Sequence, residues 1–156
     1  MNILHLMSQT HLTGPEMYVA DLCKHQMQDG HQCLIVSDTL NIQTDIEYIP
    51  MSIHNRRIPN RIKNILKLIK LCKQKDIDVI HAHSRAASWL ANIVQHFTGV
   101  TFVSTVHGKQ SVHRSSQRAN IYGKYIIVVC DYLVDHLRKD LKITNAKIKV
   151  VRNGIS

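Results

Sequence analysis

The sequence predicts an α/β fold in which a doubly wound, mostly parallel sheet is the middle of three layers. Segments typical of strands and of helices alternate along all 156 residues, without repeats or low-complexity tracts. The strand-like runs are short, apolar and β-branched, as in parallel strands buried on both faces. Such alternation favours right-handed crossovers within one domain, and 156 residues bury enough surface to fold without disulfides.

Each predicted strand ends at polar or small residues. The expected strands are 2–7, 31–37, 45–50, 77–83, a run within 101–108, 125–130 and 147–151. Ligands of open α/β sheets bind beyond the carboxyl ends of the strands. The run in 101–108 stops at His107, which Gly108 follows, so we expect His107 at the edge where chemistry takes place.

Four helices are expected between these strands, at about 14–29, 59–75, 86–97 and 131–141. Thr13 and Glu16 have the spacing of a capping box, and Pro15 fits a first helical turn. Gly30 and Gly99 fall where helices end.

The second helix carries two stripes. We expect the apolar one to pack on the sheet and the basic one to face solvent. The apolar stripe is Ile62, Ile65, Leu66, Ile69 and Cys72, and the basic stripe is Lys63, Lys67, Lys70 and Gln74.

The chain is strongly basic, with 20 Lys and Arg against 11 Asp and Glu, a formal charge of +9 and a pI near 9.6. This balance favours an anionic partner. Nucleic acid is disfavoured because no aromatic residues interleave with the basic runs. Four cysteines without C-x-x-C spacing indicate reduced core residues, and no signal peptide or spanning segment is evident, so we expect a cytoplasmic protein.

Three patterns could carry function, each with a plainer alternative. The helix start at Thr13 and Gly14 could bind an anion, or be an ordinary helix start. His81, His83 and His107 could suggest zinc, but no carboxylate or thiolate lies near them, so no metal is predicted. The basic helix at 60–75 could lie on an anionic membrane or simply cover the sheet with a solvated lysine face. On a membrane it would be helped by Lys109, Arg114, Arg118 and Lys124.

Five motifs in register resemble a known family. They are H-L-T-G-P-E-M-Y-V, D-V-I-H-A-H-S, S-T-V-H-G, Y-I-I-V-V-C-D-Y-L and K-I-K-V-V-R-N-G-I-S. In this order and spacing they resemble the N-terminal half of the group 1 (family 4) retaining glycosyltransferases. The resemblance implies a Rossmann-like domain, one half of a GT-B fold, with residues 1–151 on the acceptor side and 152–156 starting a linker to a donor-binding domain.

The resemblance implies roles for individual residues. His107 corresponds to the catalytic-site histidine near the reacting sugar, and Thr13 and Gly14 lie on the side of the donor diphosphate. The acceptor side comprises His83, Ser84, Arg85, Gly108 and Lys109. Three departures are Thr13 in place of a glycine, Cys130 in place of a capping serine, and Arg152 in place of proline.

The implied reaction transfers a sugar from a UDP- or GDP-sugar to an acceptor hydroxyl, with no cofactor and no metal. The sequence lacks the family's E-x7-E motif, so we expect this chain alone to be inactive. A cell-envelope glycan or glycolipid is the expected acceptor. Arg61, Lys63, Lys67 and Lys70 are expected to contact the inner face of the cytoplasmic membrane. A stand-alone phosphate- or nucleotide-binding module and a peripheral membrane-docking module stay open as alternatives.

Overall fold

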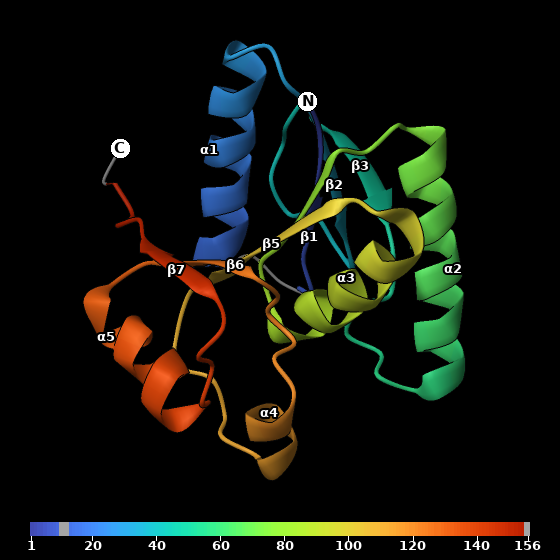
Figure 1. Ribbon diagram of the computed structural model, residues 1–156. Coiled ribbons are helices and arrows are strands. Elements are labelled where there is room, and N and C mark those ends of the chain that lie inside the picture. Colours follow the sequence, from blue (N-terminus) through green and yellow to red (C-terminus); the bar gives the residue numbers. More distant parts are fainter. Residues whose placement is uncertain (10–12, 155–156) are drawn as a thin grey trace.

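The computed structural model describes residues 1–9 and 13–154 and confirms the α/β architecture (Figure 1). Residues 10–12, between the predicted strand 2–7 and the predicted helix at about 14–29, and residues 155–156 of the predicted linker lie outside the described residues. The strands are β1 (Asn2–Leu6), β2 (Gln32–Ser37), β3 (Glu47–Pro50), β4 (Val79–Ala82), β5 (Thr101–Val106), β6 (Tyr125–Val128) and β7 (Lys147–Val150). The helices are α1 (Gly14–Gln28), α2 (Ile58–Gln74), α3 (Arg85–Thr98), α4 (Arg114–Arg118), α5 (Asp131–Asp135) and the π-helical turn η1 (His136–Asp140).

All seven strands run parallel in the order β3-β2-β1-β4-β5-β6-β7. The chain builds the sheet outward from β1 to β3, returns to the middle at β4, and then continues outward to β7. His5 on β1 lies opposite His81 on β4 in this central pairing. The carboxyl ends of β1 and β4 therefore lie side by side where the direction of growth reverses, which is the usual ligand position in such sheets.

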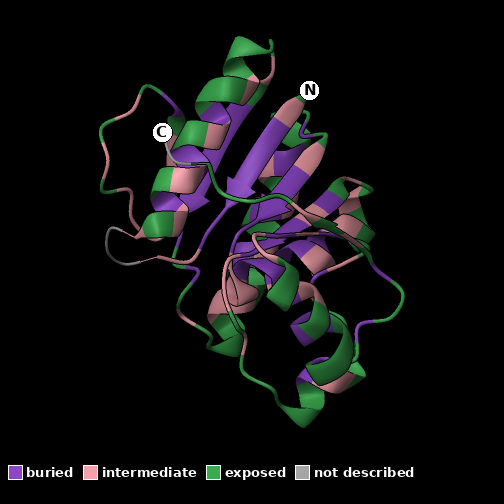
Figure 2. Cartoon of the chain, turned by 90° about the vertical axis from the view of Figure 1, so that its left-hand side faces the viewer, coloured by how far each residue is buried: buried purple, intermediate pink, exposed green. Residues whose placement is uncertain are grey.

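Apolar packing on the two faces of the sheet positions the helices. On one face, Val19 and Cys23 of α1 pack against Ile3, Met7 and Ile35. On the other face, α2 and α3 cover the centre of the sheet, and α5 with η1 covers β6 and β7. Figure 2 shows the buried strands between helices whose outer surfaces are exposed.

Two sequence predictions about helices are wrong. Thr13 is the N-cap residue of α1, but its side chain makes no capping hydrogen bond. Glu16 is buried and accepts a hydrogen bond of 2.6 Å from the backbone N–H of Asn41, so a tertiary partner replaces the capping box. In α2, Ile62 and Leu66 of the predicted apolar stripe are 53% and 62% exposed.

Of the predicted stripe, Cys72 is buried and Ile65 and Ile69 are half-buried against the core, and the other buried residues of α2 are Asn64 and Leu68. Asn64 is tolerated there because its amide donates a 2.8 Å hydrogen bond to the carbonyl of Ser52. The predicted helix at 131–141 is also modified, since its second half is η1 rather than α-helix.

The two edge strands carry features that oppose further strand pairing. Lys147 and Lys149 of β7 are exposed, and β3 is four residues long and ends at Pro50, which has no backbone N–H to donate. Charged residues, short strands and proline are the usual protections of sheet edges.

Gly123, just before β6, must be glycine for two reasons, and this yields a stability prediction. Its φ is +79°, and a Cβ atom there would lie 2.7 Å from the Phe102 ring. Gly30 has a similar φ of +85° but open space around it. We expect Gly30→Ala to cost about 1 kcal/mol for the backbone and Gly123→Ala about 1–3 kcal/mol more for overpacking.

Urea unfolding of the two variants beside the wild-type chain measures both costs. Equal destabilisation by the two substitutions would contradict the packing role of Gly123.

Candidate functional site

The carboxyl ends of β1 and β4 enclose a hollow of about 260 Å³, which we call the β1–β4 hollow. Its lining combines residues from both sides of the predicted site: Met7, Ser8, Gln9, Thr13, Pro15, His83 and Ser84. The structure thus brings the predicted donor-side Thr13 together with the acceptor-side His83 and Ser84.

Four histidines lie beside this hollow. His5 and His81 share a face because they are paired in the register of β1 and β4, and His83 follows two residues later on the same face. His5 Nδ1 lies 3.0 Å from His83 Nε2, and His83 Nδ1 lies 3.4 Å from His107 Nε2. His81 Nε2 makes a 2.6 Å hydrogen bond with Thr105 Oγ1.

This chain of rings determines the tautomer of each member. The side-chain oxygen of Gln26 accepts only, so His5 Nε2, 2.9 Å away, must donate. In a neutral ring Nδ1 of His5 then accepts, which makes His83 Nε2 a donor and His83 Nδ1 an acceptor. His107 in turn donates from Nε2. Its Nδ1 is therefore the basic nitrogen of the ring.

Burial keeps these histidines neutral. Desolvation lowers the pKa of His5 to about 4, against a small opposing effect of the Gln26 hydrogen bond, and lowers the pKa of His107 to about 4. The pKa values of His81 and His83 lie well below the ordinary range, first because of burial and then because neighbouring histidines disfavour a second positive charge. At neutral pH the cluster is a polar but uncharged network.

The same side chains have ligand atoms close enough to hold a metal ion: His5, His81 and His83 form one such group and His5, Cys23 and Cys33 another. The imidazoles of His5, His81 and His83 are, however, satisfied by hydrogen bonds to each other, to Gln26 and to Thr105. A metal would have to break these bonds, and neither group includes a carboxylate.

The remaining predicted residues occupy distinct positions. Gly14 is exposed at the start of α1, with no heavy atom within 4 Å of a Cβ built on it. Ser84 caps α3 by accepting a hydrogen bond of 3.1 Å from the N–H of Ala87. Gly108 is half-buried and Lys109 is exposed, both in the loop that follows β5.

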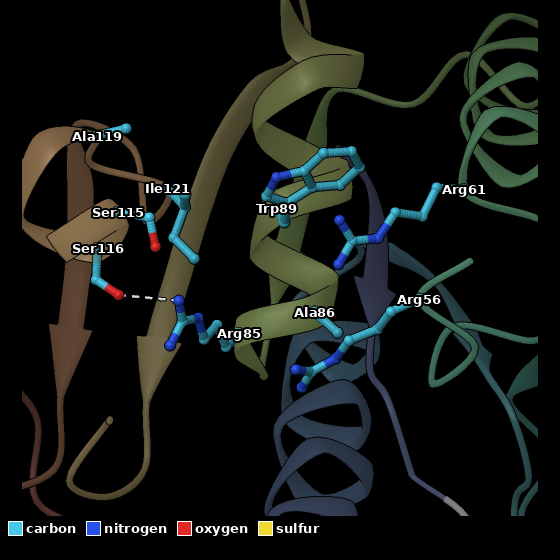
Figure 3. A pocket seen from close by; sticks show the side chains of 9 residues that line it. All are labelled: Arg56, Arg61, Arg85, Ala86, Trp89, Ser115, Ser116, Ala119 and Ile121. Atoms are coloured by element: carbon cyan, nitrogen blue, oxygen red, sulfur yellow. Dashed lines mark hydrogen bonds between the residues drawn. The ribbon is translucent and has the colours of Figure 1, made fainter. Parts of the chain in front are cut away.

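Arg85 and Arg61 line a second cavity of about 310 Å³, which we call the arginine groove. Figure 3 shows its lining residues: Arg56, Arg61, Arg85, Ala86, Trp89, Ser115, Ser116, Ala119 and Ile121. Arg61 was predicted to contact a membrane with the lysines of α2, but its guanidinium lies 4.1 Å from the centre of the Trp89 ring. Lys63, Lys67 and Lys70 are exposed.

Sequence reasoning missed Tyr18, His5 and Gln26. The Tyr18 ring packs edge-on against His107, with centroids 5.0 Å apart. The one signal that could have found Tyr18 is its spacing, one turn into α1 after Gly14, which brings it near the edge of the sheet. The roles of His5 and Gln26 depend on strand register and helix packing, which no local pattern encodes.

Similar solved structures identify the class of fold. A glycosyltransferase from Rickettsia africae ESF-5 matches with a TM-score of 0.86 and 23% identity over 99% of this chain and 43% of that chain. Anabaena HepE in complex with UDP matches with a TM-score of 0.75 and 17% identity over 99% and 44%. The lipopolysaccharide outer core galactosyltransferase WaaB matches with a TM-score of 0.73 and 14% identity over 100% and 46%.

The fold is therefore that of a Rossmann-like domain of GT-B glycosyltransferases. The sequence matches the profile of Glycosyltransferase Family 4 over residues 12–156, and the chain belongs to this family. A comparison with curated proteins gave no significant sequence match. The chain spans less than half the length of the three similar structures described above.

The neutral histidines predict sensitivity to mild acid. An unfolded histidine takes up a proton near pH 6.5 whereas folded His5 does so only near pH 4, so the free energy of unfolding falls as the pH drops below about 6.5. Between pH 7 and pH 5 we expect His5 alone to account for about 2 kcal/mol, and the other three histidines to act in the same direction.

Urea unfolding at several pH values measures this slope. His5→Gln should reduce it by about one proton, whereas His113→Gln, at an exposed position, should leave it unchanged. A slope that is the same in His5→Gln as in the wild-type chain would contradict the neutral, buried state of His5.

Proposed function

We propose that this chain is the acceptor-side part of a retaining glycosyltransferase that moves a sugar from a nucleotide-sugar donor to an acceptor hydroxyl. Family membership supports the reaction class. The observation that carries the proposal is the β1–β4 hollow, where Thr13, His83 and Ser84 meet and His107 is the next ring along the histidine chain. Residues 1–151 form the proposed domain, and 152–156 begin the proposed linker.

The geometry suggests how each side chain contributes. His107 is neutral, so it acts on the reacting sugar by hydrogen bonding rather than by charge, with Nδ1 accepting from a sugar hydroxyl. The rings of Tyr18 and His83 both pack against the His107 ring. Gly14 is exposed at the start of α1, and a helix N-terminus favours the negative charge of a leaving diphosphate.

The donor is a UDP- or GDP-sugar, and the acceptor is a cell-envelope glycan or glycolipid. Structures of HepE with UDP, with UDP-glucose and with UDP and glucose support a nucleotide-sugar donor. The similarity to a lipopolysaccharide galactosyltransferase supports an envelope acceptor. No cofactor or metal takes part in the proposed reaction.

The alternative is a stand-alone nucleotide-binding module, and donor affinity separates the two functions. Within the described residues the helix N-termini at the hollow, those of α1 and α3, belong to one side of the proposed cleft, so much of the developing charge faces water. We expect UDP- and GDP-sugars to bind no more tightly than about 1 mM, roughly −4 kcal/mol, and to undergo no transfer.

Isothermal titration calorimetry with a panel of sugar nucleotides tests this expectation. Micromolar affinity, or turnover by the purified 156-residue chain, would favour the stand-alone module and contradict the acceptor-side assignment.

A second candidate function, peripheral attachment to the inner face of the cytoplasmic membrane, is favoured by the surface of α2. Ile58, Ile62 and Leu66 are 71%, 53% and 62% exposed along one ridge of the helix, and the exposed Lys63, Lys67 and Lys70 run beside it. Apolar side chains beside a basic stripe are typical of helices that lie in a membrane interface. No helix within residues 1–9 and 13–154 has the length and apolar character needed to cross a bilayer.

Vesicle sedimentation tests this surface with charge-matched variants. Replacing Lys63, Lys67 and Lys70 by Gln should weaken binding to anionic vesicles at least tenfold, since each lysine near the surface contributes about 1 kcal/mol. Replacing the exposed Arg138, Lys139 and Lys142, in and just after η1, by Gln changes the net charge equally away from α2 and should have little effect. Equal sedimentation of the wild-type chain with neutral and anionic vesicles at low salt would contradict membrane attachment.

A further inference from the structure

The arginine groove gathers three guanidinium groups from separate elements. Arg56 comes from the segment before α2, Arg61 from the first turn of α2, and Arg85 from the start of α3. Figure 3 shows Arg61 and Arg56 on one side of α3 and Arg85 on the other, reaching toward α4. Segments far apart in the sequence thus place three positive charges around one cavity of about 310 Å³.

These charges are not balanced by acids of the chain. No aspartate or glutamate lines the groove, and within residues 1–9 and 13–154 none of the three arginines takes part in a salt bridge. Burial lowers the pKa of Arg61, and the nearby charge of Arg56 lowers it further. Since guanidinium groups stay charged at neutral pH, an anion in the groove would relieve this repulsion.

Two of the arginines are already oriented. Arg61 stacks on Trp89, which fixes the plane of the guanidinium and leaves the N–H groups along its edge available. Arg85 donates from Nη2 to Ser116 Oγ at 2.9 Å and from Nη1 to the carbonyl of Ser111 at 3.4 Å. Donors that are held in place before binding lose less entropy when the ligand arrives.

We propose that the arginine groove binds a phosphoryl group, as a phosphate or diphosphate ester, carried by the sugar acceptor. This inference rests on the proposed function. The groove and the β1–β4 hollow share the start of α3, because Ser84 lines the hollow and Arg85, the next residue, lines the groove. An acceptor held in the groove by its phosphoryl group would therefore present its sugar toward His83 and His107.

The chemistry of the lining favours a phosphoryl group over a carboxylate or an uncharged sugar. Planar guanidinium groups pair with phosphate oxygens through two parallel hydrogen bonds, and three of them carry enough positive charge to neutralise a phosphate dianion or a diphosphate. Ser115 and Ser116 of α4 also line the groove and add hydroxyl groups to its surface. An uncharged sugar would leave the three guanidinium groups without a counter-charge.

The test is titration of the chain with inorganic pyrophosphate, followed by calorimetry and by backbone amide shifts. We expect saturable binding that weakens with salt, with the largest shifts around residues 56, 61, 85 and 116. Arg61→Gln and Arg85→Gln should each weaken binding about tenfold, the loss of one charge-assisted contact. Arg61→Lys, which keeps the charge but not the paired donors, should fall between Arg61→Gln and the wild-type chain.

Arg57→Gln is the matched control. Arg57 is exposed, follows Arg56 directly and does not line the groove, so this variant makes the same charge change with an expected effect below about twofold. Unfolding curves of all variants identify any that fail to fold. The proposal is overturned if pyrophosphate does not bind, or if Arg57→Gln weakens binding as much as both groove variants.

Two further sets of titrations identify the molecule that carries the phosphoryl group and distinguish this inference from the proposed function. Glucose 1-phosphate represents a soluble acceptor and farnesyl diphosphate a lipid-linked one, and preferential binding of either one identifies the source.

Unphosphorylated glucose at high concentration tests the hollow alone. Shifts at His83 and His107 with glucose, without pyrophosphate binding, would overturn the phosphoryl site and keep the acceptor-side assignment. Pyrophosphate binding with no sugar-dependent shift at His83 or His107 would keep the groove as an anion site but contradict its role in holding an acceptor.

Discussion

The pairing of β1 with β4 is the constraint on which the rest of the structure depends. Because both strands run parallel in the middle of the sheet, their following loops leave toward opposite faces, one into α1 and the other into α3. The space between the two loops is the β1–β4 hollow. The same register places His5 opposite His81, so the position of the hollow and the assembly of the histidine cluster have one cause.

The histidine cluster links the site to the packing of the first helix. Within the described part of the chain every buried side-chain nitrogen and oxygen has a hydrogen-bond partner, and the imidazoles achieve this mainly through one another. The series of bonds from His107 through His83 and His5 ends at Gln26 of α1. The orientation of His107 at the surface is thus coupled to a helix residue on the far side of two buried rings, and the low polarity around those rings strengthens each bond in the series.

Much of the fold, but less of the site, could be predicted from the sequence. Short β-branched runs identified all seven strands, and Gly30 and Gly99 marked helix ends with φ values of +85° and +74°. The predicted capping box does not form because the Glu16 carboxylate accepts a hydrogen bond from the backbone N–H of Asn41, far from the start of α1 in the sequence. Asn64 replaced an apolar residue on the buried side of α2 because the Ser52 carbonyl lay within reach of its amide.

For the site, the H-x-H spacing placed His81 and His83 on one face, and the end of β5 placed His107 near them. His5 could not be added without the strand register. The arginine groove could not be predicted from the sequence either, because Arg56, Arg61 and Arg85 come together only through the packing of α2 beside α3. Charge composition favoured an anionic partner, but the position of the arginine groove could be found only from the fold.

The protected sheet edges determine how copies of this domain can meet one another. A parallel sheet grows most readily by accepting another strand at an open edge, and here one edge carries the lysines of β7 while the other is the short β3, which ends at Pro50. Growth of the sheet between molecules is therefore disfavoured at both ends. Contacts with other macromolecules are left to the helix faces and to the loops at the carboxyl edge.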